Sequence, residues 1–145
     1  MPGVSGAISR VTYLYHRLRI QSIGQNKPLG ICGTGALEAV AAMRREGLLD
    51  KSGLLAPELF ESGLVLAQRE DGSDIRLTQG DIRNIQMAKA AIRAGIDTLL
   101  LRYQEAMRPQ RLKVGRVYLA GGFGYYLNPQ EAAEISAPDV PKMDG

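Results

Sequence analysis

A single long amphipathic helix is the feature that most constrains how this chain can fold. Across residues 79–105, apolar side chains recur at steps of three and four residues and form one continuous apolar stripe. The apolar stripe consists of Ile85, Ala88, Ile92, Ile96, Leu99 and Tyr103. Thr78 is suited to cap the N-terminus, with Asp81 three residues later as in a capping box, where Glu or Gln is more usual. The pattern predicts a helix over 79–105 with one apolar face.

Paired short strands and a shorter helix are predicted before the long helix. Residues 7–23 alternate imperfectly between apolar and polar side chains, which indicates two short strands. Residues 36–46 carry apolar side chains at helical spacing, and Gly47 stands where a helix ends. Residues 64–68 and 75–77 are strand candidates, joined by an Asp-Gly turn of the kind that hairpins favour.

Two further elements are predicted after the long helix. Residues 114–120 form a short apolar run that predicts a buried strand, and Pro129 stands at the first position of a helix predicted over 130–135. The full order is paired strands, helix, paired strands, long helix, strand and helix, with a glycine loop before the first and the last helix. This order, without internal repeats, is typical of an α/β fold, with α+β as the alternative.

Length and composition are those of an ordinary globular domain. The 145 residues fit one domain, and the hydrophobic share of 45% and charged share of 23% are usual values. The apolar stretch over residues 96–101 is broken by Asp97 and Thr98 and falls far short of the about 20 residues that cross a bilayer. The N-terminus has no signal peptide pattern. We therefore expect a cytoplasmic protein with no membrane partner.

The single cysteine and the single histidine exclude several kinds of site within this chain. Cys32 allows no internal disulfide, which agrees with a reducing compartment. Cys32 and His16 alone cannot form a zinc site or hold an iron–sulfur cluster, so no metal site is predicted here. A nucleophilic cysteine would need a nearby base, and nothing places His16 close, so a structural role for Cys32 is favoured. The net charge of +3 is spread, with few aromatic residues, so no nucleic acid partner is predicted.

The first glycine loop, Gly30-Ile-Cys-Gly-Thr-Gly35, ends a strand and opens a helix. Such a loop presents backbone N–H groups at the positive end of the helix dipole, which suits phosphate. Candidate contacts are Gly30, Gly33, Gly35 and Thr34, which adds a hydroxyl donor. The sequence matches neither a P-loop nor a dinucleotide fingerprint. The alternative is a tight turn in which glycine supplies a positive φ and Cys32 fills a small core hole.

The second glycine loop, Gly121-Gly-Phe-Gly124, follows directly on the predicted strand 114–120. Bare backbone at Gly121 and Gly122 would let an adenine or ribose lie against the chain, because any Cβ there would stand in the way. The alternative is a simple strand-to-helix corner. A third candidate surface lies on the long helix, where Gln86, Lys89 and Arg93 share a polar face; its alternative is an ordinary solvated face.

Several motifs occur together in an order that is specific to one family. They are Gly30-Ile-Cys-Gly-Thr-Gly35, Leu77-Thr-Gln-Gly-Asp-Ile-Arg83, Gln86-Met-Ala-Lys-Ala-Ala-Ile-Arg-Ala-Gly95, Arg116-Val-Tyr-Leu-Ala-Gly-Gly-Phe-Gly124 and Leu127-Asn-Pro129. Over about residues 28–135 the chain resembles the C-terminal part of the actin-like (ASKHA) ATPase domain of ATP-dependent reductive activators of corrinoid proteins. These activators are iron–sulfur proteins that carry a cluster domain besides the ATPase domain.

The resemblance implies a fold and a set of nucleotide contacts. Members of the ASKHA superfamily have two ribonuclease-H-like subdomains with ATP between them, and this chain would be part of one. Gly121, Gly122, Phe123 and Gly124 match the adenosine motif. Gln86, Lys89 and Arg93 fall on a helix similar to the one that offers Lys and Arg to the adenosine in chaperone relatives. The implied organisation is N-terminal strands over 1–27, the ASKHA-like subdomain over 28–137 and a tail over 138–145.

Departures from the superfamily pattern limit what this chain is expected to do. The two phosphate loops, each a strand that ends in Asp-x-Gly-Thr, are absent, and no cysteine cluster is present. We therefore expect a fragment with no catalytic residue, which hydrolyses nothing alone, with Mg·ATP and the iron–sulfur cluster bound in the parent protein. The expected partner is the corrinoid protein of a methyltransferase system, and self-association is expected from open sheet edges. The alternative is a non-catalytic protein-interaction module with an actin-like half-fold.

Overall fold

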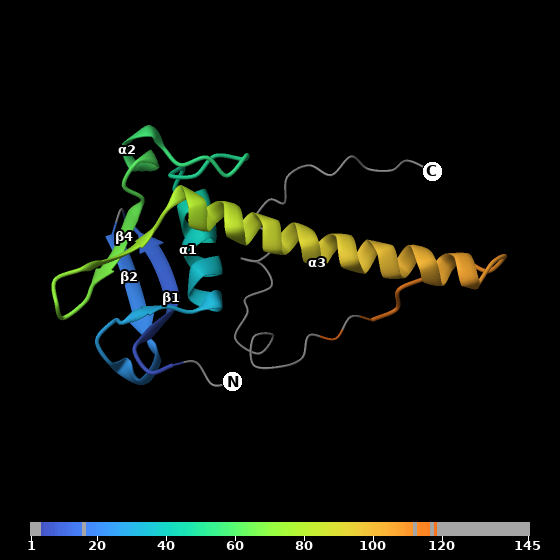
Figure 1. Cartoon of the computed structure of the whole chain (residues 1–145), viewed down its shortest axis with the longest axis horizontal. Helices are drawn as coiled ribbons and strands as arrows, with labels where there is room; N and C mark the ends of the chain where they lie inside the picture. Colours follow the sequence, from blue (N-terminus) through green and yellow to red (C-terminus); the bar gives the residue numbers. More distant parts are fainter. Residues whose placement is uncertain (1–3, 16, 112, 117, 119–145) are drawn as a thin grey trace.

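The computed structural model describes residues 4–15, 17–111, 113–116 and 118. Strands and short helices form a body at one end, and one long helix projects from it (Figure 1). In chain order the elements are β1 (Ala7–Leu14), β2 (Arg17–Ser22), the 3-10 helix η1 (Ile23–Gln25), β3 (Gly30–Ile31), α1 (Gly33–Arg45), α2 (Pro57–Phe60), β4 (Leu64–Gln68), β5 (Asp74–Leu77) and α3 (Gln79–Ala106). No helix within these described ranges has both the length and the apolar character needed to cross a bilayer.

The N-terminal strands form a three-stranded sheet in the order β2-β1-β3. β1 and β2 are antiparallel, with a bulge between Ile8 and Arg10, which accounts for the imperfect alternation in the sequence. β3 pairs with β1 in parallel through only two residues, Gly30 and Ile31. The prediction of two strands within residues 7–23 is confirmed.

α1 packs closely against β1 and begins inside the first glycine loop. A Cβ on Gly35 would lie 2.2 Å from the carbonyl oxygen of Ile8, so the helix approaches the strand backbone more closely than any other residue would allow. The helix was predicted over 36–46, but Gly33, Thr34 and Gly35 already form its first turn. It ends at Arg45, and Gly47 terminates it as predicted: its φ of +73° allows the last carbonyls to be paired as in a Schellman motif.

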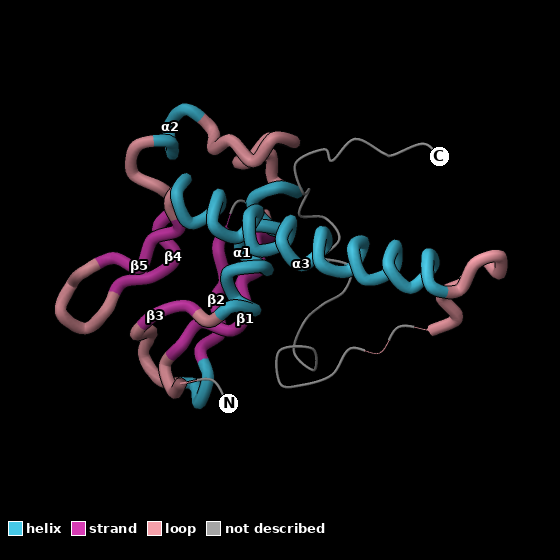
Figure 2. Tube along the Cα trace, turned by 45° about the vertical axis from the view of Figure 1, so that its right-hand side comes forward, coloured by secondary structure: helices cyan, strands magenta, loops and turns pink. Residues whose placement is uncertain are grey.

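The β4–β5 hairpin completes the body beside the first sheet (Figure 2). Its turn is stabilised by the Asp71 carboxylate, which accepts a hydrogen bond from the Ser73 backbone N–H at 2.9 Å, and Gly72 has a φ of +82°. One hydrophobic core joins both sheets with α1 and the start of α3. It contains Ile8, Val11, Ala39, Val40, Met43, Leu49, Leu55, Leu66, Ile75, Leu77 and Ile82. The predicted hairpin is confirmed.

α3 confirms the predicted long helix and its cap. The Thr78 hydroxyl accepts a hydrogen bond from the Asp81 N–H at 3.3 Å, and the Asp81 carboxylate accepts one from the Thr78 N–H at 2.8 Å. Only the first two turns of this 28-residue helix enter the body, where Ile82 and Gln86 are buried. The rest projects into solvent (Figure 1).

The strand predicted over 114–120 is not formed at its described positions. Residues 114–116 and 118 have no regular structure, and Val114 and Tyr118 are exposed. A strand needs a neighbour to pair with, and no described strand lies alongside these residues. The second glycine loop and the helix predicted over 130–135 lie outside the described residues.

The contact between Gly35 and Ile8 predicts that Gly35→Ala destabilises the domain. Alanine favours a helix by about 1 kcal/mol over glycine. The clash with a rigid backbone carbonyl outweighs this gain, so we expect a net loss of about 1–3 kcal/mol in the free energy of unfolding, measured in urea. Gly30→Ala is the matched control, because nothing lies within 4 Å of its added Cβ. An unchanged stability of Gly35→Ala would contradict the packing at this position.

Candidate functional site

The three candidate residues on α3 have different surroundings. Gln86 is buried, with 6% of its surface exposed, and its side-chain amide is engaged within the domain. Its Nε2 donates to the Ser52 carbonyl at 3.0 Å, and its Oε1 accepts a hydrogen bond from Arg83 at 2.8 Å. A contact between this amide and a nucleoside would have to compete with both bonds.

Gln86 belongs to a clamp between α3 and residues 50–55, here called the 50–55 loop. The Gln79 side chain accepts a hydrogen bond from the Leu55 N–H at 2.8 Å and donates one to the Gly53 carbonyl at 2.7 Å. Arg83 donates to the Ser52 carbonyl at 2.9 Å. Gly53 has a φ of +81°, and a Cβ on it would lie 2.2 Å from the Gln86 Nε2. The clamp therefore needs glycine at this position.

Asp50 holds the 50–55 loop from within. One carboxylate oxygen accepts hydrogen bonds from the Leu54 N–H at 2.9 Å, the Ser52 N–H at 2.8 Å and the Ser52 hydroxyl at 2.7 Å. The bond from the Leu54 N–H, followed by that from the Ser52 hydroxyl, holds the pKa of the Asp50 carboxyl below its ordinary value. The Asp50 carboxylate is therefore ionised when it accepts the hydrogen bonds that hold the loop.

A small hollow lies between the end of α1 and the start of α3. It is lined by Val40, Arg44, Leu49, Asp50, Lys51, Gly53, Ile82 and Gln86. Its volume is about 10 Å³, which is room for about one water molecule and not for a nucleoside. Arg44 reaches the Leu49 carbonyl at 3.4 Å, and its buried Nε has no hydrogen-bond partner. Sequence reasoning missed Arg44, whose only signal was its place in the last turn of a predicted helix.

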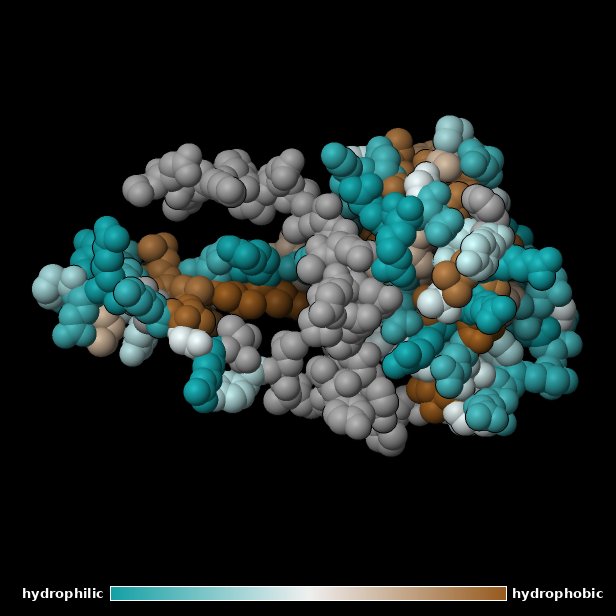
Figure 3. Space-filling model, turned by 180° about the vertical axis from the view of Figure 1, so that it is seen from behind, coloured by the Kyte–Doolittle hydropathy of each residue, from teal (hydrophilic) through white to brown (hydrophobic). Residues whose placement is uncertain are grey.

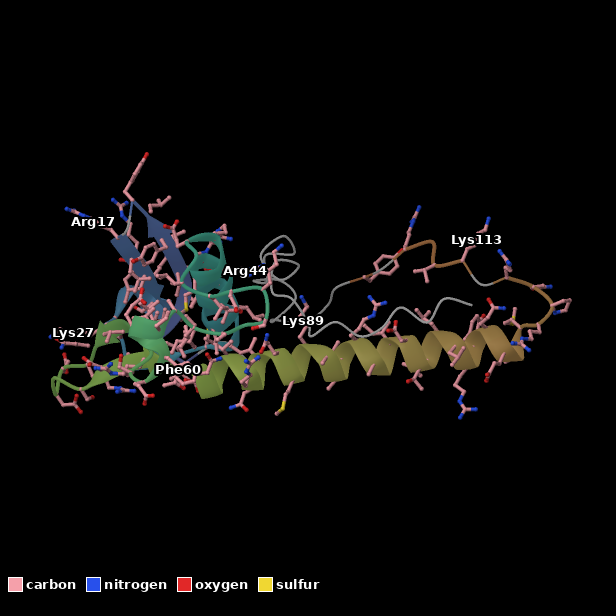
Figure 4. The ribbon with its side chains drawn as sticks, turned by 90° about the horizontal axis from the view of Figure 1, so that it is seen from above. Arg17, Lys27, Arg44, Phe60, Lys89 and Lys113 are labelled. Carbon is pink, nitrogen blue, oxygen red and sulfur yellow. The ribbon has the colours of Figure 1, made fainter. Side chains whose placement is uncertain are left out.

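Lys89 and Arg93 lie beyond the clamp, where α3 leaves the body. Lys89 is half-buried, and burial lowers the pKa of its ammonium group. Figure 4 shows Lys89 at the base of the projecting part of the helix. Arg93 is exposed and forms an ion pair with Asp97 one turn later, with 2.7 Å between Nε and Oδ2; this hydrogen bond raises the pKa of the guanidinium.

The first glycine loop packs largely inward. Thr34 is buried, and its hydroxyl lies 3.1 Å from the Cys32 sulfur. Gly35 is closed in by β1, whereas Gly33 is exposed and Gly30 is half-buried. None of these glycines has a positive φ, so the alternative of a left-handed turn is wrong in this detail; the close approach at Gly35 is what requires glycine. Ligand contacts at these four positions stay a prediction.

Other predicted residues cannot be related to this geometry. Gly121, Gly122, Phe123 and Gly124 lie outside the described residues, as does His16. Within the described ranges, no group of three or more His, Cys, Asp or Glu side chains is arranged to hold a metal ion. The structure therefore brings Gln86 and Lys89 to the base of α3, with Arg93 one turn further out.

The fold and the sequence together define an α/β domain of the ASKHA class. A family model described as the C-terminal domain of RACo, the ASKHA domain, matches residues 1–144. The chain belongs to this family. The resemblance that the motifs indicated is thereby confirmed.

Named relatives agree with the family. The chain is 29% identical over 164 residues to "Corrinoid activation enzyme RamQ" of Eubacterium limosum, covering 100% of this chain and 27% of that protein. It is 29% identical over 109 residues to "[Co(II) methylated amine-specific corrinoid protein] reductase" of Methanosarcina barkeri, covering 75% of this chain and 18% of that protein. A solved structure, "Reductive activator for corrinoid,iron-sulfur protein", is similar with a TM-score of 0.72 and 36% identity, over 90% of this chain and 22% of that one. The chain thus spans about a quarter or less of the length of these relatives.

The clamp predicts that Gln86→Ala lowers stability. The substitution removes both hydrogen bonds of a buried amide. A typical intramolecular hydrogen bond contributes about 0.5–1.5 kcal/mol net, so the loss of both costs about 1–3 kcal/mol. We expect a loss of this size in the free energy of unfolding, measured by urea denaturation. Arg93→Ala on the same helix is the control, and its stability should equal that of the unmodified chain because the ion pair is exposed. Equal losses in both variants would contradict the structural role of Gln86.

Proposed function

We propose that this chain is the adenosine-binding portion of a larger, cytoplasmic, ATP-dependent reductive activator of a corrinoid protein. The observation that carries the proposal is the match of residues 1–144 to the ASKHA domain of the RACo family. The printed names of the relatives support it, since each refers to the activation or reduction of a corrinoid protein. The proposed partner is accordingly a corrinoid protein, and one that serves a methyltransferase system.

The described residues fit the adenosine end of an ATP molecule better than its phosphate end. Lys89 and Arg93 lie four residues apart on α3 and are directed to neighbouring positions, where a cation can donate to ribose hydroxyls or lie against a base. Gln86 would support this surface through the clamp rather than donate to the ligand. The described part of the chain offers no acidic cluster for Mg²⁺. In the proposed protein, other segments would hold the metal and the phosphates.

The proposed chemistry is an uphill electron transfer that ATP hydrolysis drives. The corrinoid cobalt would be reduced from Co(II) to Co(I), with the electron supplied by an iron–sulfur cluster in another part of the larger protein. One cysteine in this chain cannot hold such a cluster. The part of this chain would be to bind the nucleotide and transmit its presence as a change in conformation.

A protein-interaction module that binds no nucleotide is the second candidate. The observation that favours it is the exposed apolar face of α3, because large exposed apolar patches mark interaction sites. A measurement of nucleotide binding distinguishes the two functions. Only the first predicts that the chain binds nucleotide and that binding depends on the second glycine loop and on Lys89.

Gly122→Asp is predicted to weaken the binding of ATP·Mg to the larger protein. A side chain there would fill the space in which adenosine lies against bare backbone, and its carboxylate would repel the phosphates. We expect at least a tenfold loss of affinity by isothermal titration calorimetry. Gly72→Asp, in the β4–β5 turn, is the control, because nothing lies within 4 Å of a Cβ at Gly72 and Asp tolerates its left-handed backbone better than most residues do. The same affinity in Gly122→Asp and in the unmodified protein would refute the adenosine role of this loop.

Lys89→Gln is predicted to lower the affinity for ATP·Mg without unfolding the domain. Lys89 lies next to the clamp but is not among its residues, so its loss removes a donor from the proposed ribose surface and leaves the core in place. The same titration measures the effect, with circular dichroism to verify folding. Arg102→Gln, further along α3 with 79% of its side chain exposed, should bind as the unmodified protein does. If both variants bind equally well, Lys89 does not contact the nucleotide.

A further inference from the structure

The apolar stripe of α3 is exposed over most of its length and has no assigned role so far. Ile85, at its start, packs against the core, but the stripe leaves the body after that. Ile92 is 66% exposed, Leu99 72% and Tyr103 54%. Figure 3 shows the band of apolar side chains along the projecting helix. Apolar side chains that stay in water do not stabilise the helix. We therefore expect another apolar segment to pack on the stripe.

The chain itself turns back at the far end of α3. The Met107 N–H donates to the Tyr103 carbonyl and the Gln110 N–H donates to the Met107 carbonyl, both at 3.0 Å. The Gln104 side chain fixes the turn by donating to the Gln110 carbonyl at 2.7 Å. The described residues that follow run back toward the body (Figure 1, Figure 2).

The returning segment has unburied apolar side chains of its own. Val114 is 58% exposed and Tyr118 is 80% exposed. The sequence from residue 117 to residue 128 contains no charged side chain and includes Phe123, Tyr125 and Tyr126. Two apolar surfaces that are joined by a short turn meet at an effective concentration in the millimolar range, which a separate molecule does not reach under ordinary conditions.

The lengths of the two segments match. An α-helix rises about 1.5 Å per residue, so the stretch from Lys89 to Ala106 spans roughly 26 Å. An extended chain advances about 3.3 Å per residue, so about eight residues from Gln110 cover the same distance. An extended segment would therefore bring Tyr118 level with Lys89. Gly121, three residues further on, would then be level with about Ile82, in the first turns of α3.

We propose that the apolar stripe of α3 is the docking surface for the C-terminal segment of this same chain, from Val114 to the second glycine loop. Docking buries the stripe and the aromatic segment against each other. It also completes the candidate site, because it carries Gly121 and Gly122 to the base of α3; this last consequence rests on the proposed function. A second copy of the chain is the competing occupant.

Hydrogen exchange followed by mass spectrometry on the 145-residue chain, without nucleotide, tests the docking. In the unmodified chain we expect the amides of residues 114–120 to exchange at least about tenfold more slowly than an unstructured peptide. Leu99→Arg should abolish this protection. Leu101→Arg is the matched control, because it adds the same charge about 200° around the helix and should leave the protection in place. Protection over Ala7–Leu14 in the same samples shows that the body remains folded.

Three outcomes would overturn the proposal. The first is exchange of residues 114–120 at the unstructured rate in the unmodified chain, and the second is equal protection in both variants. The third is protection that rises with protein concentration together with a dimeric mass in light scattering, which would assign the stripe to a second copy. Because no nucleotide is present, failure here leaves the proposed function standing, and loss of nucleotide binding in the variants above leaves the docking standing.

Discussion

The clamp between α3 and the 50–55 loop is the interaction on which the rest of the arrangement depends. Only the first two turns of α3 touch the body, so the direction of the whole helix is set there. Three side chains of α3 bind backbone groups of the loop, and the Asp50 carboxylate stiffens the loop from the other side. Hydrogen bonds have defined lengths and directions, whereas apolar contacts alone would let the helix pivot. Lys89 and the apolar stripe are positioned through this clamp.

Local features of the fold were predictable from the sequence, because neighbouring residues determine them. The capping box at Thr78, the Gly47 stop and the Asp-Gly hairpin each depend on a few adjacent side chains, and the structure has all three. The close contact of Gly35 with Ile8 was not predictable, since it joins residues far apart in the chain. The burial of Gln86 was missed for the same reason. Its helical spacing with Lys89 and Arg93 suggested one polar face, but the 50–55 loop covers only the first of the three.

The candidate site was predictable mainly as a family feature. The glycine loops alone did not distinguish a ligand contact from a tight turn. The structure favours a packing role for Thr34 and Gly35, which are buried within the domain. The ordered combination of motifs was far more specific, and the family match over residues 1–144 confirms it. No motif could predict the burial and the ion pairing of each side chain. Burial lowers the pKa of Lys89, while Asp97 engages Arg93, so the two cations would meet a ligand with different desolvation costs.

The candidate site and the apolar stripe lie on the same helix, so the proposed nucleotide binding would be linked to the proposed docking of the C-terminal segment. A nucleotide that contacted both Lys89 and the second glycine loop, as proposed, would bind only molecules in which the segment is docked. The apparent affinity for the nucleotide would then be the intrinsic affinity multiplied by the fraction of molecules in which the segment is docked. Nucleotide binding would in turn shift the chain toward the docked form. The same segment would carry that shift along α3, away from the body, to the turn at Met107–Gln110. A conformational signal from ATP would thus have a physical route through this chain, from the clamped base of the helix to its projecting end.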